Sequence, residues 1–515
     1  MVNNKNELER GAGLLLSISS LPSKYGIGTF GDEGYKFVDM LVEANQKYWQ
    51  VLPLGPTSYG DSPYQSFSAF AGNPYFIDLD YLVKEGLLAS DEMNKFDWGS
   101  NPSYVDYEKI YNSRFIVLRK AYEASNHKKT KKYKQFLEDN AFWIEDYSFY
   151  MALKNHFDNK EWLAWDEDIR FREEKALKKY AKLLKDDVDF WKFCQFKFYE
   201  QWNDLKDYAN KKGIKVIGDI PLYVALDSSD VWVHGRLFEL DERKNPINIA
   251  GVPPDNFSAT GQRWGNPLYD WKAMEAEDFE WWRQRMASSA KLYDIIRIDH
   301  FIGIVRYYSI PSKYDTAEHG TYKKGPGKKL TDVISEAVGD KQIIAEDLGV
   351  LIPPVTKLMD KMGYPGMKIL QFGFSDPDNE YLPHNYTKNN QVVYGGTHDN
   401  ETLAGYFKGQ KPEDLKYAKE YLNANSVSEL TEATVRMGYA TSSNACIHQV
   451  QDILGLDNSA RMNTPSTLGD NWKWRMRPGE LTKAHIERLA FYAGVYGRGR
   501  KVEKEKEEKK DKKKK

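Results

Sequence analysis

The sequence predicts an α/β fold, a (β/α)8 TIM barrel with helical subdomains inserted between its strands. Short apolar runs rich in β-branched residues recur along the 515 residues, and helical patterns lie between several of them. Strand–helix–strand alternation is typical of a parallel sheet with crossover helices, and eight such units are typical of a closed barrel. One interval between runs is too long for a crossover, so the largest insertion is expected between strands two and three.

Eight segments have the composition of buried strands. In chain order they are residues 14–18, 48–54, 214–220, 295–299, 342–348, 367–374, 392–397 and 444–449. Amphipathic patterns such as 33–46 and 330–338 lie between them and predict covering helices. The series predicts a single barrel domain over residues 1–500.

Three further regions complete the predicted organisation. Residues 71–209 are rich in Lys, Glu, Tyr and Trp and predict a helical insertion, with amphipathic helices at 83–96 and 147–157. Residues 231–271 are rich in Gly and Pro and predict a long active-site loop, because long loops in compact domains are usually functional. Residues 501–515 contain nine Lys and five acidic residues and predict a disordered tail.

Composition excludes several classes of protein. The formal net charge is −2, which gives no overall field to attract nucleic acid or an anionic membrane. Cys194 and Cys446 are the only cysteines, which fits a reducing compartment. No apolar run reaches the ~18–20 residues needed to span a bilayer. The apolar segment 11–23 follows Glu7 and Glu9 rather than a cationic stretch, so it predicts a first strand and not a signal peptide, which favours the cytoplasm.

The run "DIIRIDHFIG" (294–303) ends a hydrophobic strand in charged residues. Alternate side chains of a strand share a face, so Ile296 and Ile298 should face the helices, while Arg297 and Asp299 face the barrel axis. At the carboxyl end of a barrel strand such a pair opens into the active-site mouth. Taken alone, the pair could also be a structural ion pair that closes the barrel.

The same pattern recurs at other strand ends. Glu346, Asp399 and Asp219 each follow or end an apolar run. Clustered carboxylates suit the cleavage of glycosidic bonds, in which one carboxyl attacks the anomeric carbon and another protonates the leaving oxygen. The competing interpretation is a metal hydrolase that uses His300 and His398. It is disfavoured because the first strand lacks a His-x-His pair and the chain has no His-Glu-x-x-His motif, so no metal or other cofactor is expected.

Three of these segments resemble the catalytic segments of a known family. "RIDHF" (297–301), "IAEDLG" (344–349) and "GGTHDN" (395–400) are similar to those of the amylomaltases, the 4-α-glucanotransferases of glycoside hydrolase family 77, which are related to the α-amylases. The resemblance runs from residue 11 to residue 498. It also covers the segments 21–37, 52–79, 218–232, 251–271 and 461–475. Ser58 stands where the family pattern has Gly, and the Lys-rich tail is not a family feature.

The resemblance implies roles for individual residues. Asp299 would be the nucleophile, Glu346 the general acid and then base, and Asp399 the transition-state stabiliser. Arg297 would orient Asp299 and keep it ionised. The substrate-binding residues would be Arg297, His398, Asp219, Tyr64, Tyr59, Ser62, Asp255, Trp264, His300 and Asn463. Tyr59 and Trp264 could instead be ordinary loop packing, and His300 could simply cap its strand.

The implied activity is transfer of α-1,4-glucan segments from one maltooligosaccharide or amylose chain to the 4-hydroxyl of another glucan or of glucose. The reaction would retain the α-configuration through a glucosyl ester, could also form cyclic glucans, and would need no cofactor. The expected protein is a monomer or weak homodimer. An α-amylase-type hydrolase is the alternative enzyme. A glucan-binding protein on an inactive barrel is the alternative outside enzymes, and the three intact carboxyl groups argue against it.

Overall fold

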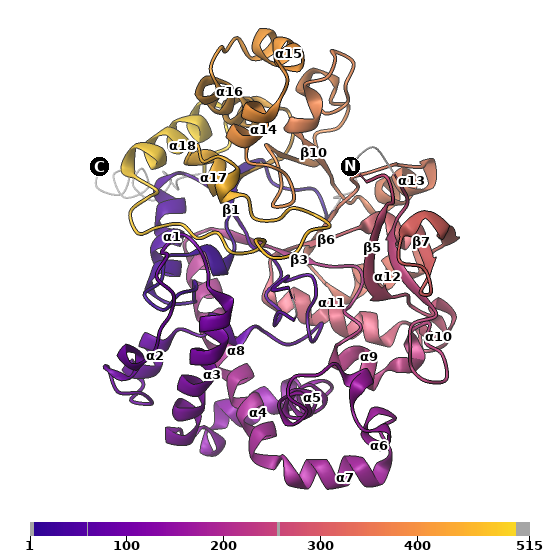
Figure 1. Cartoon of the computed structure of the whole chain (residues 1–515). Coiled ribbons are helices and arrows are strands. Elements are labelled where there is room, and N and C mark those ends of the chain that lie inside the picture. Colours follow the sequence, from indigo (N-terminus) through magenta and orange to yellow (C-terminus); the bar gives the residue numbers. More distant parts are fainter. Residues whose placement is uncertain (1–4, 59, 255–257, 501–515) are drawn as a thin grey trace, which may run out of the picture.

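The computed structural model describes residues 5–58, 60–254 and 258–500 (Figure 1). Eight parallel strands form one sheet in the order β10-β11-β12-β1-β2-β3-β6-β9. Each of the eight predicted runs overlaps one of these strands, so the predicted set of strands is confirmed. The strands are β1 (Gly11–Leu15), β2 (Tyr48–Gln50), β3 (Lys215–Ile220), β6 (Ile295–Ile298), β9 (Gln342–Ala345), β10 (Gly366–Ile369), β11 (Gln391–Tyr394) and β12 (Ala445–Gln449).

The sheet is almost closed into a barrel. Between its two outer strands, β9 and β10, the backbone N–H of Ala345 donates to the carbonyl of Pro365 at 2.9 Å. The register matters for the site: Arg297 pairs with Asp219 on β3, and Ile298 pairs with Ala345 on β9. Asp299 and Glu346 therefore leave the sheet at the same level on neighbouring strands.

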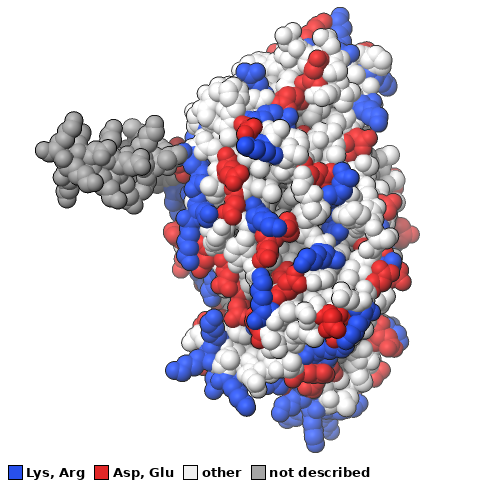
Figure 2. Space-filling model, turned by 90° about the vertical axis from the view of Figure 1, so that its left-hand side faces the viewer, with Lys and Arg blue, Asp and Glu red and all other residues white. Residues whose placement is uncertain are grey.

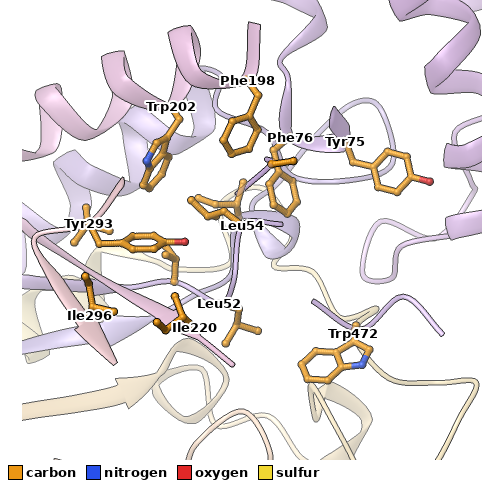
Figure 3. Close-up of a cluster of buried hydrophobic side chains, with 14 of the residues drawn as sticks. Leu52, Leu54, Tyr75, Phe76, Phe198, Trp202, Ile220, Tyr293, Ile296 and Trp472 are labelled. Atoms are coloured by element: carbon orange, nitrogen blue, oxygen red, sulfur yellow. The ribbon is translucent and has the colours of Figure 1, made fainter. Parts of the chain in front are cut away.

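The strands alternate as predicted between an inner and an outer layer. Ile295 belongs to a cluster that collects one or two apolar side chains from each of the eight strands and fills the barrel. Ile296 and Ile298 belong to the larger cluster between the barrel and its helices. Figure 3 shows Ile296 on the same side of the sheet as Tyr293 and Trp202.

Helices cover the outside of the barrel (Figure 1). The predicted helices at 33–46 and 330–338 correspond to α1 and α12. Besides α1 (Asp32–Glu43) and α12 (Lys328–Ala337), the later helices are α10 (Trp271–Ala276), α11 (Glu280–Leu292), α13 (Pro353–Met362), α14 (Leu403–Gly409), α15 (Pro412–Leu422), α16 (Val427–Ala440), α17 (Val450–Ile453) and α18 (Lys483–Val495). Among the described residues, none of these or the other helices is long and apolar enough to cross a membrane.

The interval between β2 and β3 is helical, as predicted, and forms the lower part of the molecule in Figure 1. Its helices are α2 (Leu79–Lys84), α3 (Tyr107–Ala124), α4 (Lys131–Asp139), α5 (Ile144–His156), α6 (Glu167–Arg170), α7 (Glu174–Leu183) and α8 (Lys185–Lys211). Helix α8 also contacts α11, because the Trp202 indole donates to the carbonyl of Leu292, the last residue of α11, at 3.1 Å. How the chain divides into domains stays a prediction.

One predicted helix in this insertion is wrong. Residues 83–96 do not form a helix: α2 ends at Lys84, and only a short 3₁₀ turn follows at Glu92–Lys95. Gly86, with φ of +75°, takes the left-handed conformation that ends helices. The other predicted helix is confirmed: α5 (Ile144–His156) begins three residues before the predicted range 147–157 and covers all of it except Phe157.

The region 231–271 is not an irregular loop. It contains the end of α9 (Ser229–Val233) and two strands, β4 (Asn248–Val252) and β5 (Gln262–Pro267). With β7 (Arg306–Pro311) and β8 (Thr321–Lys324) they form an antiparallel sheet in the order β5-β4-β7-β8. Because β4 pairs with a strand some distance along the chain, local Gly and Pro content gave the wrong prediction.

Candidate active site

Arg297 is the centre of an ionic chain at the barrel mouth. Its Nη1 donates to both carboxylate oxygens of Asp219, at 2.8 and 2.6 Å, and lies 3.1 Å from Oδ1 of Asp299. The Tyr64 hydroxyl donates to Oδ2 of Asp219 at 2.7 Å. Arg297 and Asp219 are buried, so each charge depends on the other for compensation.

Asp299 stands directly after β6, as predicted, and its side chain is 28 % exposed. Its backbone N–H donates to the carbonyl of Ile220 at 2.9 Å, which fixes the turn out of the strand. Burial raises the pKa of Asp299 well above its ordinary value, and the nearby Arg297 opposes the rise. The Arg297 guanidinium thus lowers the pKa of Asp299, as predicted, but in the free protein burial raises that pKa by more.

Glu346 follows β9 and is held by backbone donors. The N–H of His300 donates to Oε2 at 2.7 Å, and the N–H of Leu348 donates to Oε1 at 2.8 Å. Burial raises the pKa of Glu346 to about 7, and Arg297 and the two backbone donors oppose the rise. A carboxyl with this pKa can carry a proton at neutral pH and release it during a reaction.

Asp399 lies beyond its strand rather than at the strand end. Strand β11 stops at Tyr394, and Asp399 stands five residues further on. The Asn463 amide donates to Oδ1 of Asp399 at 2.6 Å, and Arg461 donates to its backbone carbonyl at 2.7 Å. Nε2 of His398 lies 3.4 Å from Oδ2. Asn463 therefore orients the carboxyl group of Asp399 and Arg461 holds its backbone, although both residues lie far along the sequence from Asp399.

Aromatic rings form two groups at the mouth. Tyr64 stacks on His398 with ring centroids 5.2 Å apart, and Trp472 lies beside both rings. His300 meets the edge of Trp264, with centroids 4.9 Å apart. Trp264 lies in β5 and His300 directly follows Asp299, so this second pair of rings lies on the Asp299 side of the mouth.

The other predicted residues have mixed outcomes. Ser62 accepts the backbone N–H of Tyr64 at 3.2 Å and so shapes the turn that carries Tyr64. The Trp264 indole donates to Gln262 in its own strand, at 3.1 Å. His300 has φ of +54°, a conformation that is uncommon outside Gly, and this turns its backbone N–H toward Glu346. Tyr59 and Asp255 lie outside the described residues.

Two residues of the site were not predicted. Arg461 and Trp472 lie in the segment 461–475, which carries part of the family resemblance and supplied Asn463. That segment could have been searched as a whole, but no local pattern shows that it reaches Asp399 and His398. Among the described residues, no group of three or more His, Cys, Asp or Glu is arranged to hold a metal ion.

A parallel barrel with Asp299 and Glu346 directly after two neighbouring strands, and Asp399 in the segment after a third, is typical of enzymes of the glycoside hydrolase class. Residues 16–482 match the model of glycoside hydrolase family 77, described as 4-alpha-glucanotransferase, and the chain belongs to this family.

The chain is similar to named relatives over nearly its whole length. It is 50% identical to a 4-alpha-glucanotransferase of Clostridium butyricum over 487 residues, covering 94% of this chain and 100% of the relative. It is 44% identical to the 4-alpha-glucanotransferase of Thermus thermophilus, covering 95% and 99%. Among solved structures, an amylomaltase from Streptococcus agalactiae in complex with acarbose has a TM-score of 0.92 at 44% identity, covering 96% of this chain and 100% of that one.

Proposed function

We propose that the protein is a 4-α-glucanotransferase that moves an α-1,4-glucan segment to the 4-hydroxyl of another glucan or of glucose. One observation supports this most strongly: two neighbouring strands of a family 77 barrel present Asp299 and Glu346 at the same level in different environments. The relatives are named for this activity, and the related amylomaltase structure contains acarbose.

In the first step, a carboxylate oxygen of Asp299 attacks the anomeric carbon of the donor. The bond from that carbon to the leaving 4-oxygen breaks, and protonated Glu346 gives its proton to that oxygen. The products are a shortened chain with a free 4-hydroxyl and a glycosyl ester on Asp299. Arg297 supports this step, because a cation 3.1 Å away favours the ionised form of the attacking carboxyl.

In the second step, ionised Glu346 takes the proton from the 4-hydroxyl of an acceptor glucan. The acceptor oxygen attacks the anomeric carbon, the ester bond breaks, and Asp299 is released as a carboxylate. Two inversions retain the α-configuration. Asp399, held by Asn463, would bind sugar hydroxyls and favour the positive charge that develops on the ring.

Transfer requires that a sugar acceptor compete with water for the ester. Oriented binding can give effective molarities of up to ~10⁵–10⁸ M, far above any solvent concentration. The β4–β5 region, with Trp264 against His300, would cover the acceptor side. A chain that folds back its own 4-hydroxyl would give a cyclic glucan by the same step.

We also propose a cytoplasmic monomer or weak homodimer. Figure 2 shows acidic and basic side chains intermixed on one face, which fits a neutral glucan better than nucleic acid.

Incubation with maltotriose tests this function. Transfer should give glucose and a ladder of longer maltooligosaccharides, while total reducing ends stay nearly constant, because each bond broken is matched by one made. A steady rise in reducing ends, without products longer than maltotriose, would instead support the α-amylase-type hydrolase.

A further inference from the structure

Gln371 lies in the short 3₁₀ helix Leu370–Gly373, which directly follows β10. Its backbone N–H donates to the carbonyl of Gly395 at 3.1 Å and so extends the pairing of β10 with β11 beyond the strand ends. Its side-chain Nε2 donates to the carbonyl of Glu401 at 2.7 Å. This single residue, only 4 % exposed, therefore holds both ends of the segment 395–401.

The segment 395–401 carries His398 and Asp399 into the barrel mouth, and its own bonds shape a tight turn. Oδ1 of Asn400 accepts the backbone N–H of Thr397 at 2.8 Å and the Thr397 hydroxyl at 2.9 Å. The backbone N–H of Asn400 donates to the carbonyl of Thr397 at 3.0 Å. These bonds fix the shape of the turn, but they do not fix its place relative to the barrel strands.

Gly396 makes room for the side chain of Gln371. A β-carbon at Gly396 would lie 3.0 Å from Nε2 and 3.1 Å from Cδ of Gln371, which is closer than an ordinary van der Waals contact, and 3.1 Å from Cβ of Asn400. The Gln371 amide therefore packs directly against the backbone of the segment to which it bonds.

Two residues from another part of the chain also hold this segment. The backbone N–H of Asn463 donates to the carbonyl of His398 at 3.1 Å, and Arg461 donates to the carbonyl of Asp399 at 2.7 Å. Gln371 differs from them because it directly follows a barrel strand and so links the segment to the sheet. Without the Gln371 side chain the segment should shift rather than come free.

We propose that Gln371 is a positioning residue: its side-chain amide holds the segment 395–401 in place relative to β10 and thereby places the carboxyl group of Asp399 in the barrel mouth. A side chain without an N–H donor would leave the carbonyl of Glu401 without this bond. The consequence for catalysis rests on the proposed function, in which Asp399 stabilises the transition state, whereas the placement of the segment does not.

The first test removes the donor. Gln371→Met keeps the length of the side chain and the backbone bond to Gly395, but it cannot donate to Glu401. We expect kcat for maltotriose to fall about 10- to 100-fold with KM within about threefold, as for a catalytic group that is slightly misplaced.

Gln201→Met is the matched control. Gln201 of α8 is 3 % exposed, and its side chain also holds backbone: Oε1 accepts the N–H of Asp78 at 2.6 Å, and Nε2 donates to the carbonyl of Asp78 at 3.2 Å. This variant loses two bonds of the same kind, so it should be destabilised at least as much as Gln371→Met, yet kcat should stay within about threefold of the wild type. Wild-type kcat in Gln371→Met, or an equal loss of kcat in Gln201→Met, would overturn the proposal.

Hydrogen exchange followed by mass spectrometry tests the placement without any activity. Peptides that cover residues 395–403 should exchange severalfold faster in Gln371→Met than in the wild type, and at the wild-type rate in Gln201→Met. Unchanged exchange in Gln371→Met would overturn the proposal. A wild-type protein that fails to transfer glucans, while its variants show the expected exchange, would refute only the proposed function.

A smaller substitution keeps the proposal testable if Gln371→Met does not fold. Gly396→Ala would press on the Gln371 amide, so the same peptides should exchange faster and kcat should fall about three- to tenfold. Gly494→Ala in α18 is its control, because a β-carbon there meets nothing within 4 Å, and it should change neither quantity. Wild-type exchange and wild-type kcat in Gly396→Ala would overturn the proposal.

Discussion

Asp299 and Glu346 stand at the same level on neighbouring strands, but the protein treats them differently. Asp299 is partly exposed and faces the guanidinium of Arg297, whereas Glu346 is 7 % exposed and receives two backbone N–H groups. Environment, rather than residue type, divides the work of a carboxyl pair between a nucleophile and an acid. Asp299, which faces the Arg297 cation, is therefore suited to attack, and the buried Glu346 is suited to proton transfer.

The largest expected effect is at the nucleophile. Asp299→Asn should lower kcat/KM for maltotriose by about 10⁴- to 10⁶-fold, the range seen when other covalent enzymes lose a catalytic group. Asp347→Asn is the matched control, because Asp347 is also partly buried and follows β9, but it accepts the backbone N–H of Met367, which an Asn oxygen can also do. Loss of less than about tenfold is expected there. Equal losses of kcat/KM in Asp299→Asn and Asp347→Asn would contradict the assignment of Asp299 as the nucleophile.

The next effect concerns the cation that marks the Asp299 side. Arg297→Met would leave the buried carboxyl group of Asp219 and the partly exposed one of Asp299 without their partner, and breaking the buried Arg297–Asp219 pair in this way costs ~3–5 kcal/mol of unfolding free energy. Urea denaturation measures this cost. Lys328→Met, which removes an exposed ion pair with Asp332, should change stability by less than ~1 kcal/mol. Similar small changes in both would show that Arg297 is not needed to compensate its neighbours.

A smaller effect is expected from pH. With the pKa of Glu346 raised to about 7, the acid is protonated below that pH and ionised above it. The first step needs the protonated form, so kcat/KM for maltotriose should fall as pH rises through about 7. A maltosyl fluoride donor needs no acid for its leaving group, and its kcat/KM should lack this fall. The same decline with both donors would place the titrating group elsewhere.

No effect is expected from removing metals. The proposed steps use only carboxyl groups and an arginine, so activity on maltotriose should survive exhaustive dialysis against EDTA. Loss of activity that one added cation restores would revive the metal-hydrolase alternative for His300 and His398.

The sequence predicted the barrel well because each strand is a local apolar run. It predicted the level of Asp299 and Glu346 because both directly follow such runs. Local sequence pattern therefore predicts the strands and the residues that directly follow them.

Contacts between distant segments could not be predicted in the same way. The β4–β7 pairing, the Asn463 bond to Asp399 and the approach of Trp472 to His398 depend on how the whole chain folds. The false helix at 83–96 has another cause, since a left-handed Gly interrupts an otherwise helical composition.

The most direct test of the division between Asp299 and Glu346 is to trap the covalent intermediate. Glu346→Gln should be nearly inactive on maltotriose, yet react with a glycosyl fluoride and then accumulate the ester, because no base remains to activate an acceptor or water. Mass spectrometry of the digested protein should find the sugar on the peptide that contains Asp299. A label on Asp399 instead, or normal turnover of maltotriose by the variant, would contradict the assignment.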